Sequence, residues 1–263
     1  RALEEGPRPK LRALEPGVPL EFRGARLTAY PAGHILGAAQ LLVEWGDERL
    51  VYTGDIMLRA PLCGDLAEVV PCTRLIVEST FGLPVFRFLS REAARERIVG
   101  FARECLAGGV TPAFTGYALG RGQEIVHVLR GAGIPVAVHG AIARYLPFYS
   151  ARGYNCDGWT PYESRHLAGK ALVVPHGFSA RLEALGERVR AAYVSGWAAL
   201  DNARARARAE ELIPYSDHAG FDELLELVEA SGAREADVVH GYARPFARIL
   251  AQRGIDARAP EED

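Results

Sequence analysis

Five polar residues of this sequence stand where short apolar runs end, a position that suits chemistry. Asp55, Glu78, His218 and His240 each follow an apolar run of the kind that forms a buried strand, and His34 lies between two glycines just after another run. The carboxyl ends of strands are where α/β proteins place functional side chains. Imidazole and carboxylate groups are suitable zinc ligands, and a carboxylate can bridge two metals. Two metals about 4 Å apart can activate a water and clamp both oxygens of a phosphoryl displacement.

Glu78 and His218 would then form an acid–base pair. A carboxylate beside an imidazole raises the pKa of the imidazole and keeps it protonated, ready to donate to a leaving alkoxide. Each residue also has a structural alternative, because single histidines are commonly hydrogen-bonded in a core, and a single acidic residue can cap a helix or stabilise a turn. The recurrence of the set in one structural context favours the functional interpretation.

The elements that must position these residues indicate an α/β protein. Up to residue 77 the pattern predicts strands, with a hairpin between the third and fourth: residues 20–22, 26–30, 40–45, 49–53 and 75–77. From residue 90 helices alternate with strands. The helices are expected at 90–106, 121–130, 221–230 and 244–253, and the strands at 110–115, 134–138, 171–174, 191–194 and 236–239. This alternation is typical of βαβ units and a mostly parallel sheet.

The composition of the 263 residues excludes several classes of protein. With 49% hydrophobic and 24% charged residues and a formal net charge of -2, the chain is neither disordered nor a collagen or a coiled coil. No apolar run approaches the roughly 20 residues of a membrane span, so no membrane partner is expected. The four cysteines form no Cys-x-x-Cys pair, which predicts reduced thiols in a cytoplasmic protein.

The sequence resembles the β-CASP branch of the metallo-β-lactamase superfamily. Within it, the bacterial ligase-associated exonucleases, which are related to mRNA 3′-end processing nucleases, are the most similar group. Residues 32–38 (AGHILGA) and 52–55 (YTGD) match the third and fourth metal motifs of the family. The resemblance therefore implies that His34 is a metal ligand and that Asp55 is the bridging carboxylate.

Three further segments match the β-CASP motifs, in the family's order: 78–82 (ESTFG), 216–219 (SDHA) and 239–241 (VHG). They imply that His218 is the general acid, that Glu78 is its partner, and that His240 binds the second metal. The implied cofactor is a pair of divalent ions, zinc or alternatively manganese.

The implied fold is a metallo-β-lactamase αββα sandwich, lacking its N-terminal part, with an inserted β-CASP α/β cap domain. Residues 1–80 and 213–263 would form the two parts of the first domain, and residues 81–212 would form the cap. The family's His-x-His-x-Asp-His signature appears nowhere in the sequence, which also does not begin with Met. We therefore expect an N-terminally truncated, inactive piece of an active enzyme; the alternative is a protein that has lost catalysis.

In this family the cap forms a cleft for a nucleic-acid strand. Gly120 and Arg121 combine a flexible backbone, a helix N-terminus and a guanidinium, which suits a phosphate, although a loop and helix cap explains them equally well. Ser195, in a segment that also resembles the subgroup, joins them as a candidate phosphate-binding residue. Tyr117, Trp197 and Phe86 could stack on bases, although aromatic residues are more commonly part of a core.

The resemblance implies a metal-dependent phosphodiesterase that acts on nucleic acid, most specifically a DNA exonuclease of the ligase-associated type. One alternative is an RNA-processing nuclease of the same family, and another is a non-catalytic β-CASP subunit with an incomplete metal site. A hydrolase of small esters or thioesters is a third, disfavoured by the β-CASP motifs. The implied partners are single-stranded DNA or RNA and a DNA ligase or helicase, in DNA repair or RNA processing.

Overall fold

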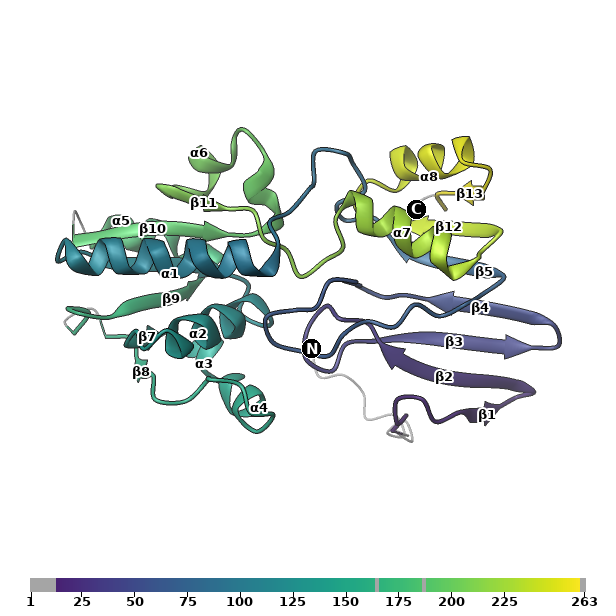
Figure 1. Ribbon diagram of the computed structural model, residues 1–263, viewed down its shortest axis with the longest axis horizontal. Coiled ribbons are helices and arrows are strands. Elements are labelled where there is room, and N and C mark those ends of the chain that lie inside the picture. Colours follow the sequence, from purple (N-terminus) through teal and green to yellow (C-terminus); the bar gives the residue numbers. More distant parts are fainter. Residues whose placement is uncertain (1–12, 164–165, 186–187, 261–263) are drawn as a thin grey trace, which may run out of the picture.

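Two β-sheets organise the chain, and they lie side by side (Figure 1). The computed structural model describes residues 13–163, 166–185 and 188–260. The first sheet takes its strands from both ends of the chain, and the second takes its strands from the middle. The polypeptide therefore leaves the first lobe after residue 78, builds the second lobe, and returns. The α/β class predicted from the sequence is confirmed.

The first sheet has seven strands in the order β1-β2-β3-β4-β5-β12-β13. The strands β1 to β4 pair antiparallel, whereas β5 pairs parallel with both β4 and β12. Residue 239 lies opposite residue 78 in the last of these ladders, so the ends of two predicted strands meet. The strands are β1 (Leu20–Phe22), β2 (Ala25–Pro31), β3 (Ala39–Trp45), β4 (Glu48–Tyr52), β5 (Arg74–Glu78), β12 (Glu235–Val239) and β13 (Asp256–Arg258).

Two helices, α7 (Phe221–Ser231) and α8 (Ala243–Gln252), cover this sheet. Residues of both helices share one hydrophobic core with β3, β4, β5 and β12, for example Leu224 and Phe246 with Leu75 and Val77. Gly232 ends α7 in the left-handed conformation, with φ of 67°, which a residue without Cβ adopts without strain.

The second sheet has six strands, all of them parallel, in the order β11-β10-β6-β9-β7-β8. Its central strand β6 is buried along its whole length, as is typical of a parallel sheet that is covered on both faces. The strands are β6 (Thr111–Gly116), β7 (Val136–Val138), β8 (Thr160–Pro161), β9 (Ala171–Pro175), β10 (Val189–Val194) and β11 (Glu211–Ile213).

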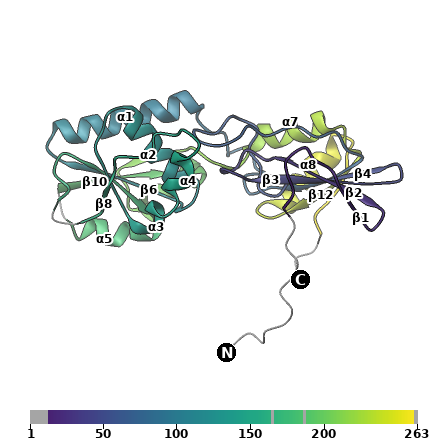
Figure 2. The ribbon, with the colours of Figure 1, turned by 90° about the horizontal axis from the view of Figure 1, so that it is seen from below.

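Helices lie on both faces of the second sheet: α1 and α2 on one, α3 and α5 on the other (Figure 2). The longest, α1, begins after the predicted cap Ser90, whose hydroxyl accepts a hydrogen bond from the Ala93 amide at 3.2 Å. The helices are α1 (Arg91–Ala107), α2 (Arg121–Gly131), α3 (Gly140–Ala143), α4 (Leu146–Ser150), α5 (Ser179–Glu183) and α6 (Ala203–Ala207), with 3₁₀ turns η1 (His176–Phe178) and η3 (Gly196–Ala199).

All the predicted strands and long helices are present, with ends displaced by one or two residues. The sequence pattern missed the short helices α3 to α6 and the strands β8 and β13, because elements of two to five residues carry too little periodicity to be recognised. Among the described helices, none combines the length and hydropathy that a membrane crossing requires.

Candidate active site

The loop after β2 that carries His34 is held against the loop after β4 that carries Asp55. Gly33 has φ of 76°, and a Cβ atom on it would lie 2.1 Å from the Met57 carbonyl, so only glycine fits there. The Met57 amide donates to the Ala32 carbonyl at 2.9 Å, and Gly33 forms a bridge with Ile56. This close approach brings two candidate ligands together from two separate turns.

His34 presents one free ring nitrogen to the carboxylate of Asp55. Its Nδ1 lies 2.8 Å from the carbonyl oxygen of Asp217, which can only accept, so Nδ1 carries the proton. In the neutral ring the lone pair is then on Nε2, which lies 3.7 Å from Asp55 Oδ2. A ring nitrogen fixed by a backbone carbonyl, with the other left free, is the usual arrangement of a metal-binding histidine.

Glu78 and His218, 140 residues apart in the sequence, form a direct pair. His218 Nδ1 lies 2.8 Å from Glu78 Oε1, and the side chain of Glu78 is only 1% exposed. The amide of Ile56 donates to Glu78 Oε1 at 3.0 Å, and the amide of Thr80 donates to Oε2 at 3.2 Å. The same Ile56 accepts from the Ala219 amide at 2.6 Å, so one turn holds both partners.

The pair is poised for proton donation. Burial raises the pKa of Glu78, but the hydrogen bond and the charge of His218 outweigh it and the pKa lies below its ordinary value. Burial lowers the pKa of His218, but the hydrogen bond and the charge of Glu78 outweigh this and raise it to about 9. At neutral pH Glu78 is therefore ionised and His218 is protonated, with its Nε2–H left for a reacting group.

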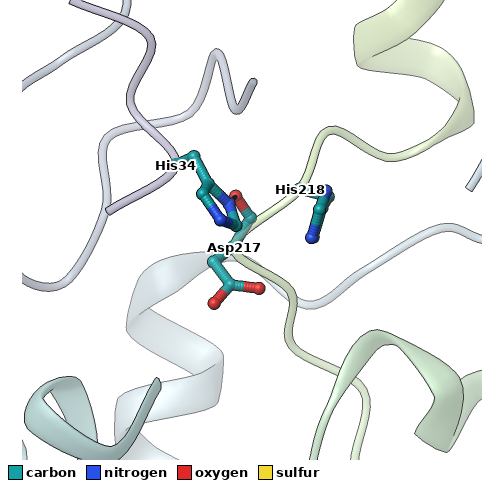
Figure 3. Close-up of side chains that lie close together, drawn as sticks. All are labelled: His34, Asp217 and His218. Carbon is teal, nitrogen blue, oxygen red and sulfur yellow. Dashed lines mark hydrogen bonds between the residues drawn. The ribbon is translucent and has the colours of Figure 1, made fainter. Parts of the chain in front are cut away.

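The two pairs adjoin each other. The ring centroids of His34 and His218 are 4.4 Å apart. Two groups of donor atoms lie close enough to share a cation: His34 with Asp217 and His218, and Asp55 with Glu78 and His218. Figure 3 shows the ring of His34 beside the Asp217 main chain, with the Asp217 carboxylate directed away from that ring. Four of the five residues predicted for this site are thus brought together.

His240, the fifth, belongs to neither of these groups. Its main chain is close, because its carbonyl accepts from the Ser79 hydroxyl at 2.6 Å, and a Cβ on Gly241 would lie 2.4 Å from Thr80 Cα. His240 has φ of 60° and is exposed, at the edge of a cavity of about 510 Å³ that Tyr242 also lines. Its role as a metal ligand stays a prediction.

Arg121 is buried, with a side chain 1% exposed, and so does not present its charge to the surface. Its Nη1 is bonded to Glu124, its Nη2 lies 3.4 Å from Asp217 Oδ1, and its guanidinium stacks 4.2 Å from the ring centroid of Tyr215. Its Nη2 makes no hydrogen bond within the described part of the chain, and Arg121 is among the residues that line a hollow of about 30 Å³ beside His218. Its role in binding phosphate stays a prediction.

Gly120 and Ser195 both act as helix caps here. Gly120 has φ of 84° and its amide donates to the Gln123 side chain at 2.7 Å; a Cβ on it would lie 2.4 Å from Ile35 of the His34 loop. The Ser195 hydroxyl accepts from the Trp197 amide at 3.3 Å, and Ser195 is 3% exposed. These placements fit the capping alternative, and a phosphate-binding role for either residue stays a prediction.

Sequence reasoning missed Asp217 and Glu124, although Asp217 lies inside the 216–219 motif and Glu124 lies three positions after the candidate Arg121. Asp217 joins the site to the second lobe, because its carbonyl binds His34 and its carboxylate pairs with Arg121. Glu124 is the i+3 neighbour of Arg121 on α2 and accepts from the Leu62 amide at 2.8 Å. A signal was present in the acidic residue three positions after an arginine, a spacing that favours an ion pair on one helix face.

One protein resembles the chain along most of its length, and others resemble less than half of it. A probable DNA ligase of Opitutus terrae is 32% identical over 241 residues, which are 90% of this chain and 24% of that protein. Endoribonuclease YSH1 of Yarrowia lipolytica is 34% identical over 46% of this chain and 14% of its own length. An RNase J-like protein of Methanocaldococcus jannaschii is 32% identical over 38% of this chain and 24% of its own. The chain spans about a quarter or less of these relatives, and no family model matches it.

A solved structure shares the fold. The crystal structure of a protein of unknown function from Enterococcus faecalis matches 90% of this chain and 63% of its own, with a TM-score of 0.61 at 15% sequence identity. At that identity the likeness concerns the arrangement of the elements alone.

Proposed function

Because the chain belongs to the β-CASP branch of the metallo-β-lactamase superfamily, we propose that it contributes the acid–base half of a metal-dependent nuclease site. The observation that carries the proposal is the buried Glu78–His218 pair beside the His34–Asp55 pair. Structural pairs of this kind occur singly in many cores. Here the two pairs meet at a sheet edge, with Nε2 of His34 free and the ring of His218 held protonated. This combination supports a phosphodiesterase.

The two sheets support a division of the chain into two domains. We assign residues 1–80 and 213–263 to the metallo-β-lactamase domain and residues 81–212 to the β-CASP cap. The change from one sheet to the other after β5, and the return after β11, support these limits. In this arrangement the site lies on loops of the first lobe that face the second.

The donor set fits a divalent metal in part. His34 Nε2 and the Asp55 carboxylate would hold the ion, with zinc as the first candidate and manganese as the alternative. Bound there, it would polarise a phosphate oxygen and lower the pKa of an attacking water. Two donors are fewer than the three protein ligands of a catalytic zinc site, and His240 does not supply the third in this conformation.

His218 would supply the proton that the reaction needs. Its Nδ1–H is held by Glu78, so the ring is oriented and Nε2–H remains for a reacting group; 18% of the side chain is exposed. When the P–O bond breaks, the leaving oxygen takes this proton, and the ionised Glu78 stabilises the cation before transfer. Glu78 does not touch the substrate and acts by orienting His218.

The substrate is a nucleic-acid strand. The alignment of 90% of this chain with a probable DNA ligase supports a DNA exonuclease of the ligase-associated type, with a ligase as partner. The similarity to an endoribonuclease and to an RNase J-like protein supports an RNA-processing nuclease instead. The exposed position of His240, outside the donor cluster, favours a third candidate, a non-catalytic subunit with an incomplete metal site.

The test is cleavage of end-labelled single-stranded DNA and RNA with zinc or manganese, by this chain and by the chain extended with its upstream coding sequence. We expect His218→Ala to abolish cleavage and Glu78→Gln to lower it by roughly 100-fold or more, the usual contribution of a positioned acid. His166→Ala, at a surface histidine with 71% of its side chain exposed, is the matched control. Undiminished cleavage by His218→Ala would refute the assignment, and an inactive extended protein that still binds strands would favour the non-catalytic subunit.

A further inference from the structure

The segment 215–219, which returns the chain from the second lobe to the first, contacts both lobes. Its first residue, Tyr215, lies with Oη 3.4 Å from Oε1 of Glu124 on α2. Two residues later, the carbonyl of Asp217 lies 2.8 Å from Nδ1 of His34 in the first lobe. One short stretch of main chain therefore connects a helix of the second lobe with the candidate metal ligand His34.

The guanidinium of Arg121 holds this segment at two points. Its carbon atom lies 4.2 Å from the centroid of the Tyr215 ring, and its Nη2 lies 3.4 Å from Oδ1 of Asp217. Between these points the Ser216 hydroxyl accepts from the amide of His218 at 2.8 Å. A planar guanidinium can stack on a ring and pair with a carboxylate at the same time, whereas the point charge of a lysine cannot. The main chain at Asp217 is thus fixed from the side of the second lobe.

The start of α2 also packs directly on the loop that carries His34. A Cβ atom on Gly120, the residue before the helix, would lie 2.4 Å from Cγ2 of Ile35 and 3.2 Å from Oδ2 of Asp217. Leu36, in the same loop, packs against the hydrophobic core of the second lobe. Because no side chain separates the helix from the loop at Gly120, the two must move together.

His34 needs the contact with Asp217 in order to present a free nitrogen. The carbonyl can only accept, so it keeps the ring proton on Nδ1 and leaves the lone pair on Nε2, 3.7 Å from Asp55 Oδ2. The Asp217 carboxylate is directed away from the ring (Figure 3), so the main chain and the side chain of this residue serve different partners. Partners of this kind fix the tautomer and the orientation of metal-binding histidines.

We propose that Arg121 and Asp217 are positioning residues for His34: the guanidinium fixes residue 217, and its carbonyl then holds the proton on Nδ1 and leaves Nε2 for a metal. The inference rests on the proposed function, because only there does His34 act as a metal donor. It deepens that function, since a donor on the first lobe is set by a helix of the second lobe. A complete donor set then requires that the two lobes are docked.

The experiment measures the tautomer of His34 in the 263-residue chain, in EDTA, from the nitrogen NMR shifts of the histidine rings. In the wild type we expect a single form with the proton on Nδ1. Asp217→Ala leaves Arg121 balanced by Glu124, so the cluster keeps one acid for its cation and the variant should fold. Once the main chain at this position is released, His34 should show a mixture of both tautomers.

Two further variants separate position from charge. Arg121→Lys keeps the positive charge but cannot both stack on Tyr215 and pair with Asp217, so it should give the same mixture as Asp217→Ala. Asp217→Asn keeps the shape of the side chain and an oxygen for the guanidinium, so it should retain the single tautomer. A cooperative transition in urea shows that each variant is folded.

A titration with Zn²⁺ alone, followed by the ring signals of His34, gives a second measurement. The loss of a partner that orients a metal-binding histidine lowers metal affinity by about 10-fold to 100-fold, and we expect this from Asp217→Ala. Asp222→Ala is the matched control, because it removes an aspartate that pairs with Arg87 at 2.8 Å on the exposed start of α7. It should change neither the tautomer nor the affinity.

The outcomes distinguish this inference from the proposed function. A single, unchanged tautomer of His34 in folded Asp217→Ala would overturn the inference, whether or not Arg121→Lys folds. A loss of zinc affinity in Asp217→Asn with the tautomer retained would also overturn it, because the carboxylate would then itself be a ligand. A wild-type chain that shows the expected tautomers but does not bind zinc would support the positioning role and contradict the metal site of the proposed function.

Discussion

Two buried glutamates at the junction of the lobes are alike in exposure and opposite in electrostatics. Glu78 at the end of β5 is 1% exposed, and Glu124 in the first turn of α2 is 2% exposed. The pKa of Glu78 lies below its ordinary value, whereas the pKa of Glu124 is raised to about 7. Burial alone therefore does not decide whether the pKa of a carboxylate is raised or lowered.

The number of carboxylates for each cation accounts for the difference. Glu78 is hydrogen-bonded to His218, on which Asp217 and Asp55 act only through their charge, and it accepts two backbone amides as well. Glu124 shares Arg121 with Asp217: burial raises its pKa, the charge of Arg121 lowers it only in part, and the charge of Asp217 raises it again. The Glu78–His218 pair stays ionised and can take part in proton transfer. The second cluster joins the two lobes, but its two acids share one cation, so their charges are only partly neutralised.

Removal of the shared cation tests this comparison most severely. Arg121→Met leaves Glu124 and Asp217 buried without a counter-charge, so we expect the free energy of unfolding to fall by about 3 to 5 kcal/mol. Urea denaturation at pH 7 measures it. Arg130→Met on the same helix is the matched control, because Arg130 donates to the backbone carbonyl of Asp157 near the surface. If both variants lose the same stability, the junction does not depend on a buried ion cluster.

The second prediction concerns the pH at which Glu124 titrates. Its pKa in the folded chain, about 7, is above its ordinary value of 4.5, so folding binds a proton between these values. Its destabilising contribution is absent below pH 4.5, grows as the pH rises through 7, and amounts to about 3 kcal/mol above that. The difference in unfolding free energy between Glu124→Gln and the wild type should therefore rise from pH 4.5 to pH 8.

Glu226→Gln on the exposed face of α7 should show no such rise. A Glu124→Gln difference that stays flat across this range would mean that Glu124 is not held protonated. The two glutamates would then be alike in electrostatics as well as in exposure.

The third prediction concerns the 1:1 pair. Glu78→Gln keeps the shape of the side chain and removes its charge, so the pKa of His218 should fall from about 9 toward its ordinary 6.5. The stability that this pair contributes is present below pH 6.5 and is lost as the pH rises through about 9. In the variant that loss disappears, and the loss of one buried charged hydrogen bond should cost about 1 to 3 kcal/mol at neutral pH.

Imidazole proton shifts measured by NMR in EDTA give the pKa of His218 without a metal. Glu163→Gln is the matched control, because His166 pairs with Glu163 at a similar distance, 3.0 Å, with both side chains mainly exposed. Water screens that pair, so removal of the Glu163 charge should have little effect on His166. A small shift at both histidines would show that burial does not strengthen the Glu78–His218 interaction.

The sequence could predict the strand ends and their polar residues, because periodicity and position act locally. His34, Asp55, Glu78 and His218 were selected for what precedes them in the chain, and the structure brings all four together. The sequence could not show that the side chain of His240 would be exposed. The direction of that side chain depends on a φ of 60° and on the packing of the next glycine against Thr80, and neither leaves a pattern in the sequence.

The cation at the lobe junction illustrates the same limit. Arg121 resembles a phosphate ligand by its place at a helix start. Its partner Asp217 is 96 positions away in sequence, in the segment that returns to the first lobe. Whether an arginine faces solvent or a buried acid is decided by tertiary contacts, and local spacing cannot distinguish these cases.

The smallest effect is expected where two cations serve one acid near the surface. Asp237 on β12 is bonded to Arg74 at 2.5 Å and to Arg258 at 2.5 Å, the reverse of the ratio at Arg121, but the arginines are 34% and 65% exposed. Burial raises the pKa of Asp237, and Arg258 and Arg74 lower it below 3.8, so its contribution is present above that pH and is lost as the pH falls. Because water screens the arginines, Asp237→Asn should cost less than about 1 kcal/mol at pH 7 in urea denaturation. A loss as large as that of Arg121→Met would show that the number of ion pairs, and not their shielding from water, distinguishes the lobe junction from the rest of the molecule.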